Sequence, residues 1–426
     1  MYEDALKILK DRGHIEWCSN EKELGDLFRR EMVTGYVGFD PTADSLHVGH
    51  LIPIMALSWL QRCGHRPIPL AGGGTGLIGD PSGKSKERNL LTDEKVRENM
   101  EGVKKQLAHF LDFDCGENSA LMINNYDWLA HLTFLEVLRD VGKHFSINAM
   151  ISRESVKSRL DDPEKSISYT EFSYVLLQAY DFLHLFSACN CRLQMGGNDQ
   201  QGNILSGVEL VRKKTGGEAF GATQPLLLTS SGTKFGKTED GAVWLDPART
   251  SPYRFYQFWM NVEDSAVEKL LKLFTFLPLE EIEEIMELSR KAPERREAQG
   301  RLAREVTALV HGEETAETVK KVSSILFGEA FDLRELSPEM IAALAEEVPT
   351  GHGERAFPLP LIDMLAASEA CPSKSEGRRL IKGGGLNLNG ERIAGEDRMI
   401  TEEDLLGGRY LFLRLGKKRF YLVDFK

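Results

Sequence analysis

Two spacings of apolar residues alternate along the first 247 residues: short runs typical of buried strands, and longer stretches at helical spacing. Residues 36–59 show the change most clearly. An apolar run ends in the turn cluster at 41–45, and Val48, Leu51 and Met55 then recur at helical spacing. This predicts a strand, a tight turn and a helix with a loose first turn, because Pro53 has no N–H to donate. The start of such a helix attracts anions.

The same alternation continues along the chain. Strand patterns at 66–72, 121–123 and 191–197 are separated by helical patterns at 93–111 and 131–141. Strands that alternate with helices predict an α/β fold with a doubly wound, Rossmann-type parallel sheet. Its site is expected at the carboxyl ends of the strands.

The pattern changes after residue 247. Residues 252–348 show helical spacing without strand alternation, and GHGERAFPLPL at 351–361 has the composition of a linker. A basic helix, a glycine turn and a short strand follow. We therefore expect three parts: a catalytic domain at 1–247, an α-helical domain at 248–350, and a linker with a small α+β domain at 351–426.

Composition narrows the class of protein. The formal charge of −12 argues against a protein that coats nucleic acid indiscriminately. However, residues 358–426 carry 12 Lys and Arg against 10 Asp and Glu, a local balance of +2. Six cysteines without a CxxC pair, and no apolar run of membrane-spanning length, favour a reduced cytoplasmic setting without a metal site.

Two histidines stand at the predicted helix start. His47 and His50 are three residues apart and share one face of a helix, and Gly49 between them would let a flat nucleotide approach the backbone. Two solvated histidines are an equally good interpretation of this short pattern alone.

A polar stripe interrupts the apolar helix predicted near residue 175. Tyr174, Gln178 and Asp181 stand at i, i+4 and i+7, so they lie on one face. They suit an amino acid with a phenol, whose hydroxyl Asp181 and Tyr36 could bind. Alternatively, the stripe faces water.

Two glycine-containing stretches offer charged groups. Asp80 lies in TGLIGDPSGK, which is not a P-loop because Ile78 stands where that pattern needs glycine; its carboxylate could bind an ammonium. Gly197 and Asp199 follow a predicted strand, where Asp199 could accept from ribose hydroxyls. A glycine turn capped by Asp, or a solvated loop, would explain each stretch equally well.

A second loop, TKFGKTEDG, carries Lys234 and Lys237. Two lysines on a closing loop could neutralise a leaving pyrophosphate, although such loops are ordinarily soluble surface.

Together these segments resemble class I aminoacyl-tRNA synthetases. His47-Val48-Gly49-His50 is similar to the HIGH motif of that class, and KFGKT to its KMSKS loop. Within the class the sequence is similar to bacterial tyrosyl-tRNA synthetases almost end to end, in stretches such as YVGFDPTADSLHVGH, NNYDW, RDVGKHFS, TEFSYVLLQAYDF and TSPYRFYQFW.

The resemblance implies a tyrosine–tRNA ligase that uses ATP accompanied by Mg²⁺, forms a homodimer, and takes L-tyrosine and tRNA(Tyr) as substrates. It places the tyrosine site on Tyr36, Asp80, Tyr174, Gln178, Asp181 and Gln200. The catalytic set is Thr42, His47, His50, Lys234 and Lys237, and the nucleotide site adds Gly49, Gly197 and Asp199. The C-terminal part resembles an S4 RNA-binding module with Arg378, Arg379 and Lys382 on one helix.

Some positions depart from the commonest bacterial form. Asn198 and Gln201 stand where serine and tryptophan are usual, and Val37 replaces a frequent cysteine. These changes bear on nucleotide affinity, since no charged catalytic group is lost. Two alternatives remain: a tryptophanyl-tRNA synthetase, which shares the fold and both signatures, and a non-catalytic RNA-binding relative.

Overall fold

A computed structural model describes residues 3–41, 43–80, 92–152, 156–157, 160–162, 167–227, 235–238, 241–326, 333, 336–416 and 419–426. The chain folds into two compact units. The first comprises Met1–Thr250 and Val262–Leu302, and the second comprises Ser251–Asn261 and Ala303–Lys426. The helical region at 248–350 is shared between these two units.

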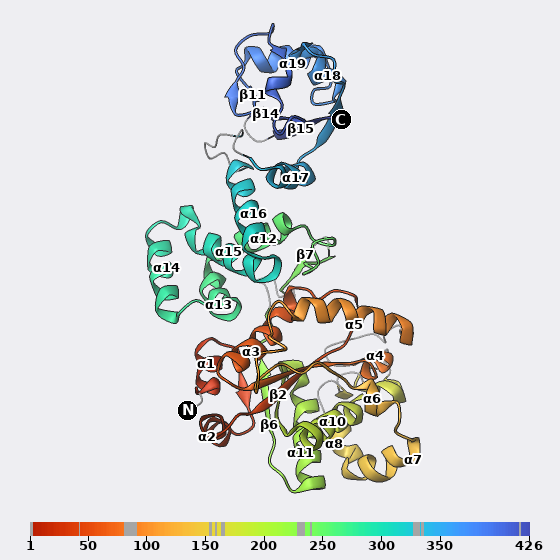
Figure 1. Ribbon diagram of the computed structural model, residues 1–426. Coiled ribbons are helices and arrows are strands. Elements are labelled where there is room, and N and C mark those ends of the chain that lie inside the picture. The colour runs from red at the N-terminus through yellow and green to blue at the C-terminus, as the bar shows by residue number, and fades with distance from the viewer. Residues whose placement is uncertain are drawn as a thin grey trace. The chain divides into compact units, whose positions relative to one another are not determined.

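A six-stranded sheet organises the first unit, in the order β1-β6-β5-β2-β3-β4. Figure 1 labels two of its strands, β2 and β6. Neighbouring strands of this sheet pair in parallel from β6 to β4, and among its described strands only the edge strand β1 is antiparallel to its neighbour. This confirms the predicted parallel sheet. The strands are β1 (Trp17–Cys18), β2 (Thr34–Phe39), β3 (Arg66–Ala71), β4 (Ile123–Asn124), β5 (Cys191–Gly197) and β6 (Phe220–Gln224).

Two crossovers run in opposite directions from the centre of this sheet. Helix α3 (Leu51–Arg62) connects β2 to β3, and α11 (Gln201–Thr215) connects β5 to β6. Because parallel crossovers are right-handed, the two helices cover opposite faces. The carboxyl ends of the adjacent strands β2 and β5 therefore open a crevice between them, the usual binding position in such sheets.

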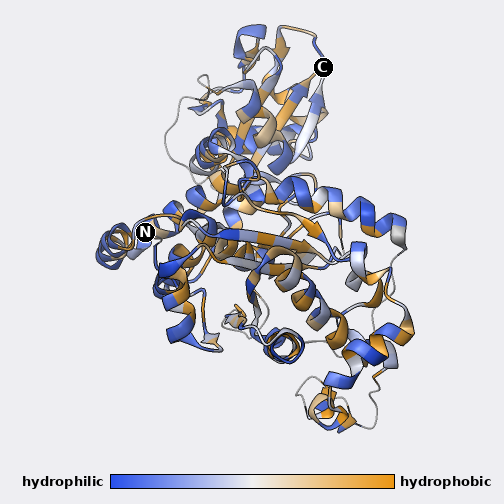
Figure 2. Ribbon diagram, turned by 60° about the horizontal axis from the view of Figure 1, so that its bottom comes forward, coloured by the Kyte–Doolittle hydropathy of each residue, from blue (hydrophilic) through white to orange (hydrophobic). Residues whose placement is uncertain are grey.

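Apolar faces explain how the helices pack on the sheet. The helices in Figure 2 change between orange and blue along their length, because one face of each is apolar and the other polar. Helix α10 (Tyr169–Cys189) lies against α11 and β5, and it begins at a capping box formed by Ser168 and Glu171. The core beneath it includes Tyr36, Ile68, Leu70, Phe182, Leu185, Leu210 and Val211.

The helix predicted at 131–141 begins three residues later than expected. Thr133 caps the N-terminus with Glu136 in a capping box, so the helix begins at residue 134 as α7 (Phe134–Glu136). It continues as a π-helix over Val137–Val141. The remaining helices of this region are α1 (Ala5–Asp11), α2 (Glu21–Arg30), α4 (Thr75–Ile78), α5 (Asp93–Leu107), α6 (Tyr126–Leu129) and α8 (Ile147–Ile151).

Arg12 fixes α13 (Asp264–Phe274) to the rest of the first unit. Its guanidinium donates to the carbonyl oxygens of Thr275 at 3.1 Å and Leu277 at 2.6 Å, and it lies 3.9 Å from the centre of the Trp59 ring. These carbonyls follow the end of α13, where a cation is favourable. Helices α14 (Leu279–Lys291) and α15 (Glu297–His311) follow, as the helical pattern predicts.

The second unit joins helices to a five-stranded sheet of order β12-β11-β14-β15-β9. Strand β9 (Thr350–Gly353) pairs in parallel with β15 (Arg419–Phe425), so the start of the expected linker is instead an edge strand. Among the described helices, none has both the length and the apolar character that a membrane span requires. The other elements are α12 (Pro252–Met260), α16 (Glu313–Leu326), α17 (Pro338–Glu347), β10 (Leu359–Pro360), α18 (Leu361–Ala367), α19 (Lys374–Lys382), β11 (Leu386–Leu388), β12 (Glu391–Arg392), β13 (Met399–Ile400) and β14 (Tyr410–Leu415).

Candidate active site

A cavity of about 480 Å³ opens at the carboxyl ends of the parallel strands. Five strands contribute to its wall, from the end of each strand or the residue just after it. These residues are Gly38 and Asp40 at β2, Gly72 at β3, Asn125 at β4, Gly197 at β5 and Gln224 at β6. The site therefore lies where the sheet topology predicts.

The polar stripe of α10 lines this cavity. Tyr174, Gln178 and Asp181 all belong to its wall, and Tyr174 and Asp181 are buried. The Tyr174 hydroxyl donates to Oδ2 of Asp40 at 3.3 Å. The stripe thus faces a cavity inside the unit and not open water.

Asp181 is a buried carboxylate held by two N–H donors. Asn125 Nδ2 donates to its Oδ2 at 2.9 Å, and Trp128 Nε1 donates to its Oδ1 at 2.8 Å. Burial raises the pKa of Asp181 to about 7, because it disfavours the charged form more than the two donors favour it. The site therefore contains a carboxyl group that titrates near neutral pH.

Tyr36 adds a polar group that lacks a bonding partner. Its side chain is only 1% exposed and lines the cavity, yet its hydroxyl oxygen has no hydrogen-bond partner within the described part of the chain. Burial, and secondly the charge of Asp181, raise the pKa of Tyr36, so it is a neutral O–H group at pH 7. An unsatisfied buried polar group costs about 1–3 kcal/mol, so a ligand hydroxyl at this position is favoured.

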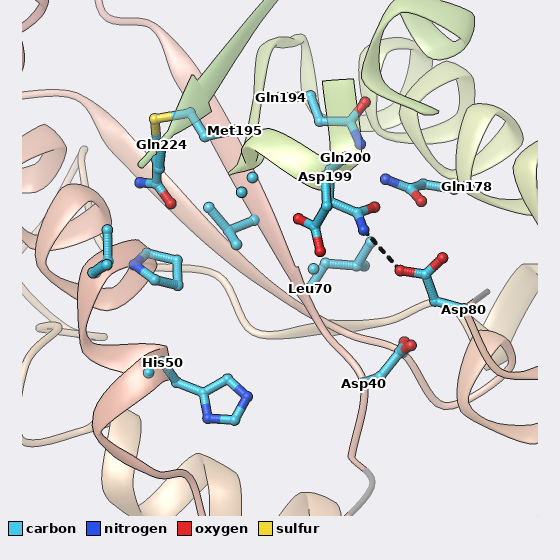
Figure 3. A pocket seen from close by; sticks show the side chains of 18 of the residues that line it. Asp40, His50, Leu70, Asp80, Gln178, Gln194, Met195, Asp199, Gln200 and Gln224 are labelled. Atoms are coloured by element: carbon cyan, nitrogen blue, oxygen red, sulfur yellow. Dashed lines mark hydrogen bonds between the residues drawn. The ribbon is translucent and has the colours of Figure 1, made fainter. Parts of the chain in front are cut away.

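A second polar cluster lines the cavity, where Asp80, Gln178 and Gln200 lie together and away from His50 (Figure 3). Gln200 Nε2 donates to Oδ2 of Asp80 at 2.7 Å, and Asn203 Nδ2 donates to the Oε1 atoms of Gln200 at 3.2 Å and Gln178 at 3.0 Å. These hydrogen bonds join three of the predicted substrate-binding residues, Asp80, Gln178 and Gln200. It presents a carboxylate and amide groups, which suit an ammonium and a carboxylate of one ligand.

His47 and His50 form a capping box before α3. The short 3₁₀ turn Val48–His50 follows His47, whose Nδ1 accepts from the N–H of Gly49 at 3.1 Å. Nδ1 of His50 accepts from the N–H of His47 at 3.1 Å, and the two rings are 4.0 Å apart. In the neutral rings the proton is therefore on Nε2, which can donate to a ligand. Desolvation, and secondly the nearby His47, lower the pKa of His50 to about 3, so it is neutral at pH 7.

The two signature segments lie against each other. The N–H of Val48 donates to the carbonyl of Val243 at 2.9 Å, and that of Val243 donates to the carbonyl of Gly236 at 2.9 Å. Gly236 has φ +83°, and a Cβ there would be 3.1 Å from Cβ of Val48. The backbone of Lys237 belongs to β7 (Lys237–Thr238), which pairs with β8 (Gly241–Ala242). Thr42, Lys234 and the side chain of Lys237 are outside the described part.

Gly197 and Asp199 complete the predicted nucleotide side of the cavity. Both line it, and a Cβ on Gly197 would be 2.7 Å from Oδ1 of Asp199, so a side chain at position 197 would require Asp199 to shift.

Comparison with known families matches almost the whole chain. Residues 29–328 match the class I tRNA synthetases (W and Y), and residues 340–423 match the SYY-like C-terminal domain of tyrosine–tRNA ligases. The chain is 51% identical to the tyrosine–tRNA ligase of Roseiflexus castenholzii over 94% of this chain and 95% of that one. This chain belongs to the tyrosine–tRNA ligases of class I.

Other relatives agree with this placement. The tyrosine–tRNA ligase of Bacillus velezensis is 49% identical over 99% of this chain and all of its own. A C-terminally truncated mitochondrial tyrosyl-tRNA synthetase of Aspergillus nidulans superposes with a TM-score of 0.69 at 35% identity, covering 76% of this chain and 94% of that chain. The tryptophanyl-tRNA synthetase of Plasmodium falciparum, at 14% identity and TM-score 0.53, shares the fold alone; it covers 79% of this chain and 87% of that one.

Several side chains of this ligase site were not predicted. Asp40 accepts from Tyr174 and, at 2.9 Å, from Thr75 Oγ1. Asn125 and Trp128 hold Asp181, and Gln194 lines the cavity with a buried Oε1 atom that has no partner among the described residues. Asp40 directly follows a predicted strand, a position that could have indicated it.

The predicted RNA-binding residues of the ligase lie on α19. Arg378, Arg379 and Lys382 are exposed, with side-chain exposures of 50%, 78% and 75%. Arg378 and Lys382 both pair with Glu396, and Arg379 pairs with Glu376. Exposed pairs of this kind are weak, so phosphates can replace the carboxylates.

The raised pKa of Asp181 predicts a pH-dependent stability. Between about pH 4, where an unfolded Asp titrates, and about pH 7, the folded ligase keeps a proton that the unfolded chain releases. The free energy of unfolding contributed by Asp181 therefore falls as pH rises through this window. Asp181→Asn removes that loss, so its stability relative to the wild type should rise from about pH 5 to pH 7, measured by urea unfolding. A difference that stays constant with pH would contradict this assignment.

Proposed function

We propose that this chain activates L-tyrosine with ATP to form tyrosyl-adenylate and pyrophosphate, and then transfers tyrosine to the 3′ end of tRNA(Tyr) in the cytoplasm. The observation that carries the proposal is the Tyr36 hydroxyl, which has no partner among the described residues and lies in the cavity that Asp181 and the two histidines also line. That cavity offers a partner for a phenol next to a binding place for phosphates.

Tyrosine would bind with its phenol between Tyr36 and Asp181. Its ammonium would contact Asp80, Tyr174 and Gln178, and its carboxylate would lie near Gln200. Phenylalanine would leave the buried polar groups of the slot unpaired, a form of selection of which tyrosyl-tRNA synthetases are a standard example. The carboxyl group of Asp80 explains why an ammonium is favoured at the end of the ligand opposite the phenol.

The chemical step needs no general base. The tyrosine carboxylate is ionised at neutral pH, and one of its oxygens attacks the α-phosphorus of ATP in line. A new carboxyl–phosphate bond forms as the bond to the bridging oxygen breaks, and pyrophosphate leaves with that electron pair. A hydroxyl of the terminal tRNA adenosine then takes the tyrosyl group, and AMP leaves.

Stabilisation of the leaving pyrophosphate would be electrostatic. We assign Thr42, His47, Lys234 and Lys237 to that role, with Nε2–H of His47 as a donor. His50, Gly49, Gly197 and Asp199 would hold the nucleotide. Mg²⁺ would arrive on the ATP phosphates, where it needs few protein ligands.

The C-terminal module would bind tRNA through phosphate contacts. Arg378, Arg379 and Lys382 lie on one helix in the part of the chain whose charge balance is positive, although the whole chain carries −12. Phosphate contacts of this kind position RNA, and they weaken as salt rises.

A homodimer would bury an exposed apolar surface near α7. Phe134 is 65% exposed, Leu135 77% and Leu138 45%, all within a single stretch of the chain. A twofold contact brings the same surface of two copies together, which would remove these side chains from water.

The activity is tested by the tyrosine-dependent exchange of pyrophosphate into ATP without tRNA. The wild type should exchange pyrophosphate into ATP when tyrosine is present. When tyrosine and tryptophan compete in this assay, tyrosine should be the amino acid that is activated. His47→Asn should lower kcat about 10- to 100-fold with little change in KM for tyrosine, because His47 acts on the pyrophosphate. No exchange by the wild type would refute the proposal and favour a non-catalytic RNA-binding protein. Equal losses in kcat and tyrosine affinity would refute the role of His47.

The dimer is tested by a charge in the apolar surface. Leu135→Asp should shift the protein to monomers in sedimentation equilibrium. A carboxylate buried at a twofold interface loses its hydration and is repelled by the same carboxylate of the second subunit. Leu288→Asp on α14, a position 55% exposed, is the matched control and should leave the mass unchanged. A dimer that tolerates Leu135→Asp would place the interface elsewhere.

A further inference from the structure

Helix α5 lies against the segment that enters the histidine turn. Asn99 Nδ2 donates to the carbonyl of Pro41 at 2.9 Å, and a Cβ on Gly102 would overlap the carbonyl oxygen of Asp44. Gln106 makes the third contact with this segment. Spacings of three and four residues place these positions on one face of the helix. This face therefore holds a loop backbone and not an apolar core.

Gln106 binds the peptide that precedes His47. Its Oε1 accepts from the N–H of Leu46 at 2.7 Å, and its Nε2 donates to Oγ of Ser45 at 2.9 Å. Oγ of the buried Ser45 in turn donates to the carbonyl of Leu46 at 2.8 Å. The amide and the carbonyl of Leu46 are thus both fixed by side chains.

The same atoms contact the segment that follows the KFGKT loop. The carbonyl of Leu46 also accepts from the N–H of Leu245 at 2.9 Å, and Oγ of Ser45 accepts from the N–H of Asp246 at 3.3 Å. Asp44 also pairs with Arg249. Gln106 therefore belongs to one hydrogen-bonded cluster that joins α5, the entrance to His47 and the exit of the lysine loop.

We propose that Gln106, acting with Ser45, is a positioning residue for adenylate formation. Its two hydrogen bonds position the backbone from which His47 projects, and they hold it next to the segment that follows the KFGKT loop. A donor displaced by about 1 Å can cost as much as 100-fold in rate, because stabilisation of a developing charge depends on prior alignment. The residues assigned to tyrosine lie on other elements, so tyrosine binding should not depend on Gln106. This inference rests on the proposed function.

The test is Gln106→Met, which keeps the side-chain length and removes both hydrogen bonds. We expect kcat for tyrosine-dependent pyrophosphate exchange to fall at least tenfold, with KM for tyrosine within twofold of the wild type. Gln106→Glu keeps the acceptor for the Leu46 N–H and should recover a large part of the rate. Lys105→Met, at an exposed neighbouring position on α5, is the matched control and should exchange at the wild-type rate.

The outcomes separate the two claims. A wild type without exchange refutes the proposed function itself. If the wild type is active and Gln106→Met exchanges pyrophosphate at the same rate as Lys105→Met, only the positioning role is overturned. The same holds if Gln106→Met loses tyrosine affinity by the same factor as kcat. If Gln106→Met does not fold, Ser45→Ala decides, because it removes the shared hydroxyl: a tenfold fall in kcat at constant tyrosine KM supports the role, and an unchanged kcat overturns it.

Discussion

The carboxyl ends of β2 and β5 lie side by side while their crossover helices leave toward opposite faces, and the rest of the site depends on this arrangement. It opens a crevice into which side chains from five strands and from α10 project. Polar groups can be buried there because the apolar faces of α3, α10 and α11 already stabilise the unit around them. The fold therefore supplies a place where unsatisfied hydrogen-bonding groups are kept available for a ligand.

The charges of this crevice divide it into two parts. The carboxyl groups of Asp40, Asp80 and Asp181 line one part, and burial raises the pKa of Asp181 to about 7. The other part contains histidines hydrogen-bonded through Nδ1, with His50 neutral at pH 7. An amino acid with a phenol and an ammonium suits the first part. A triphosphate would suit the second part together with the positive charge that we assign to Lys234 and Lys237; Gly236 of the same loop lies against Val48 of the histidine turn.

Much of this could be predicted from the sequence, because local patterns determine local structure. The strand, turn and helix from Tyr36 to Trp59 follow from apolar spacing, and the stripe on α10 follows from helical spacing. Asn125, Trp128 and Gln106 could not be predicted in this way. Each meets its partner across more than 50 positions of the chain, and only the folded sheet brings them together. Strand β9 was missed for the same reason, since its partner β15 is about 70 residues away.

The central claim is that the buried hydroxyl of Tyr36 and the buried carboxyl group of Asp181 bind the phenol of the substrate. Calorimetric titration of the wild type and Tyr36→Phe with L-tyrosine and L-phenylalanine tests it most directly. Loss of one buried hydrogen bond, about 1.4 kcal/mol, should weaken tyrosine binding to Tyr36→Phe about tenfold and leave phenylalanine no weaker than in the wild type. Equal affinities of the wild type for the two amino acids, or equal losses for both in the variant, would contradict the account.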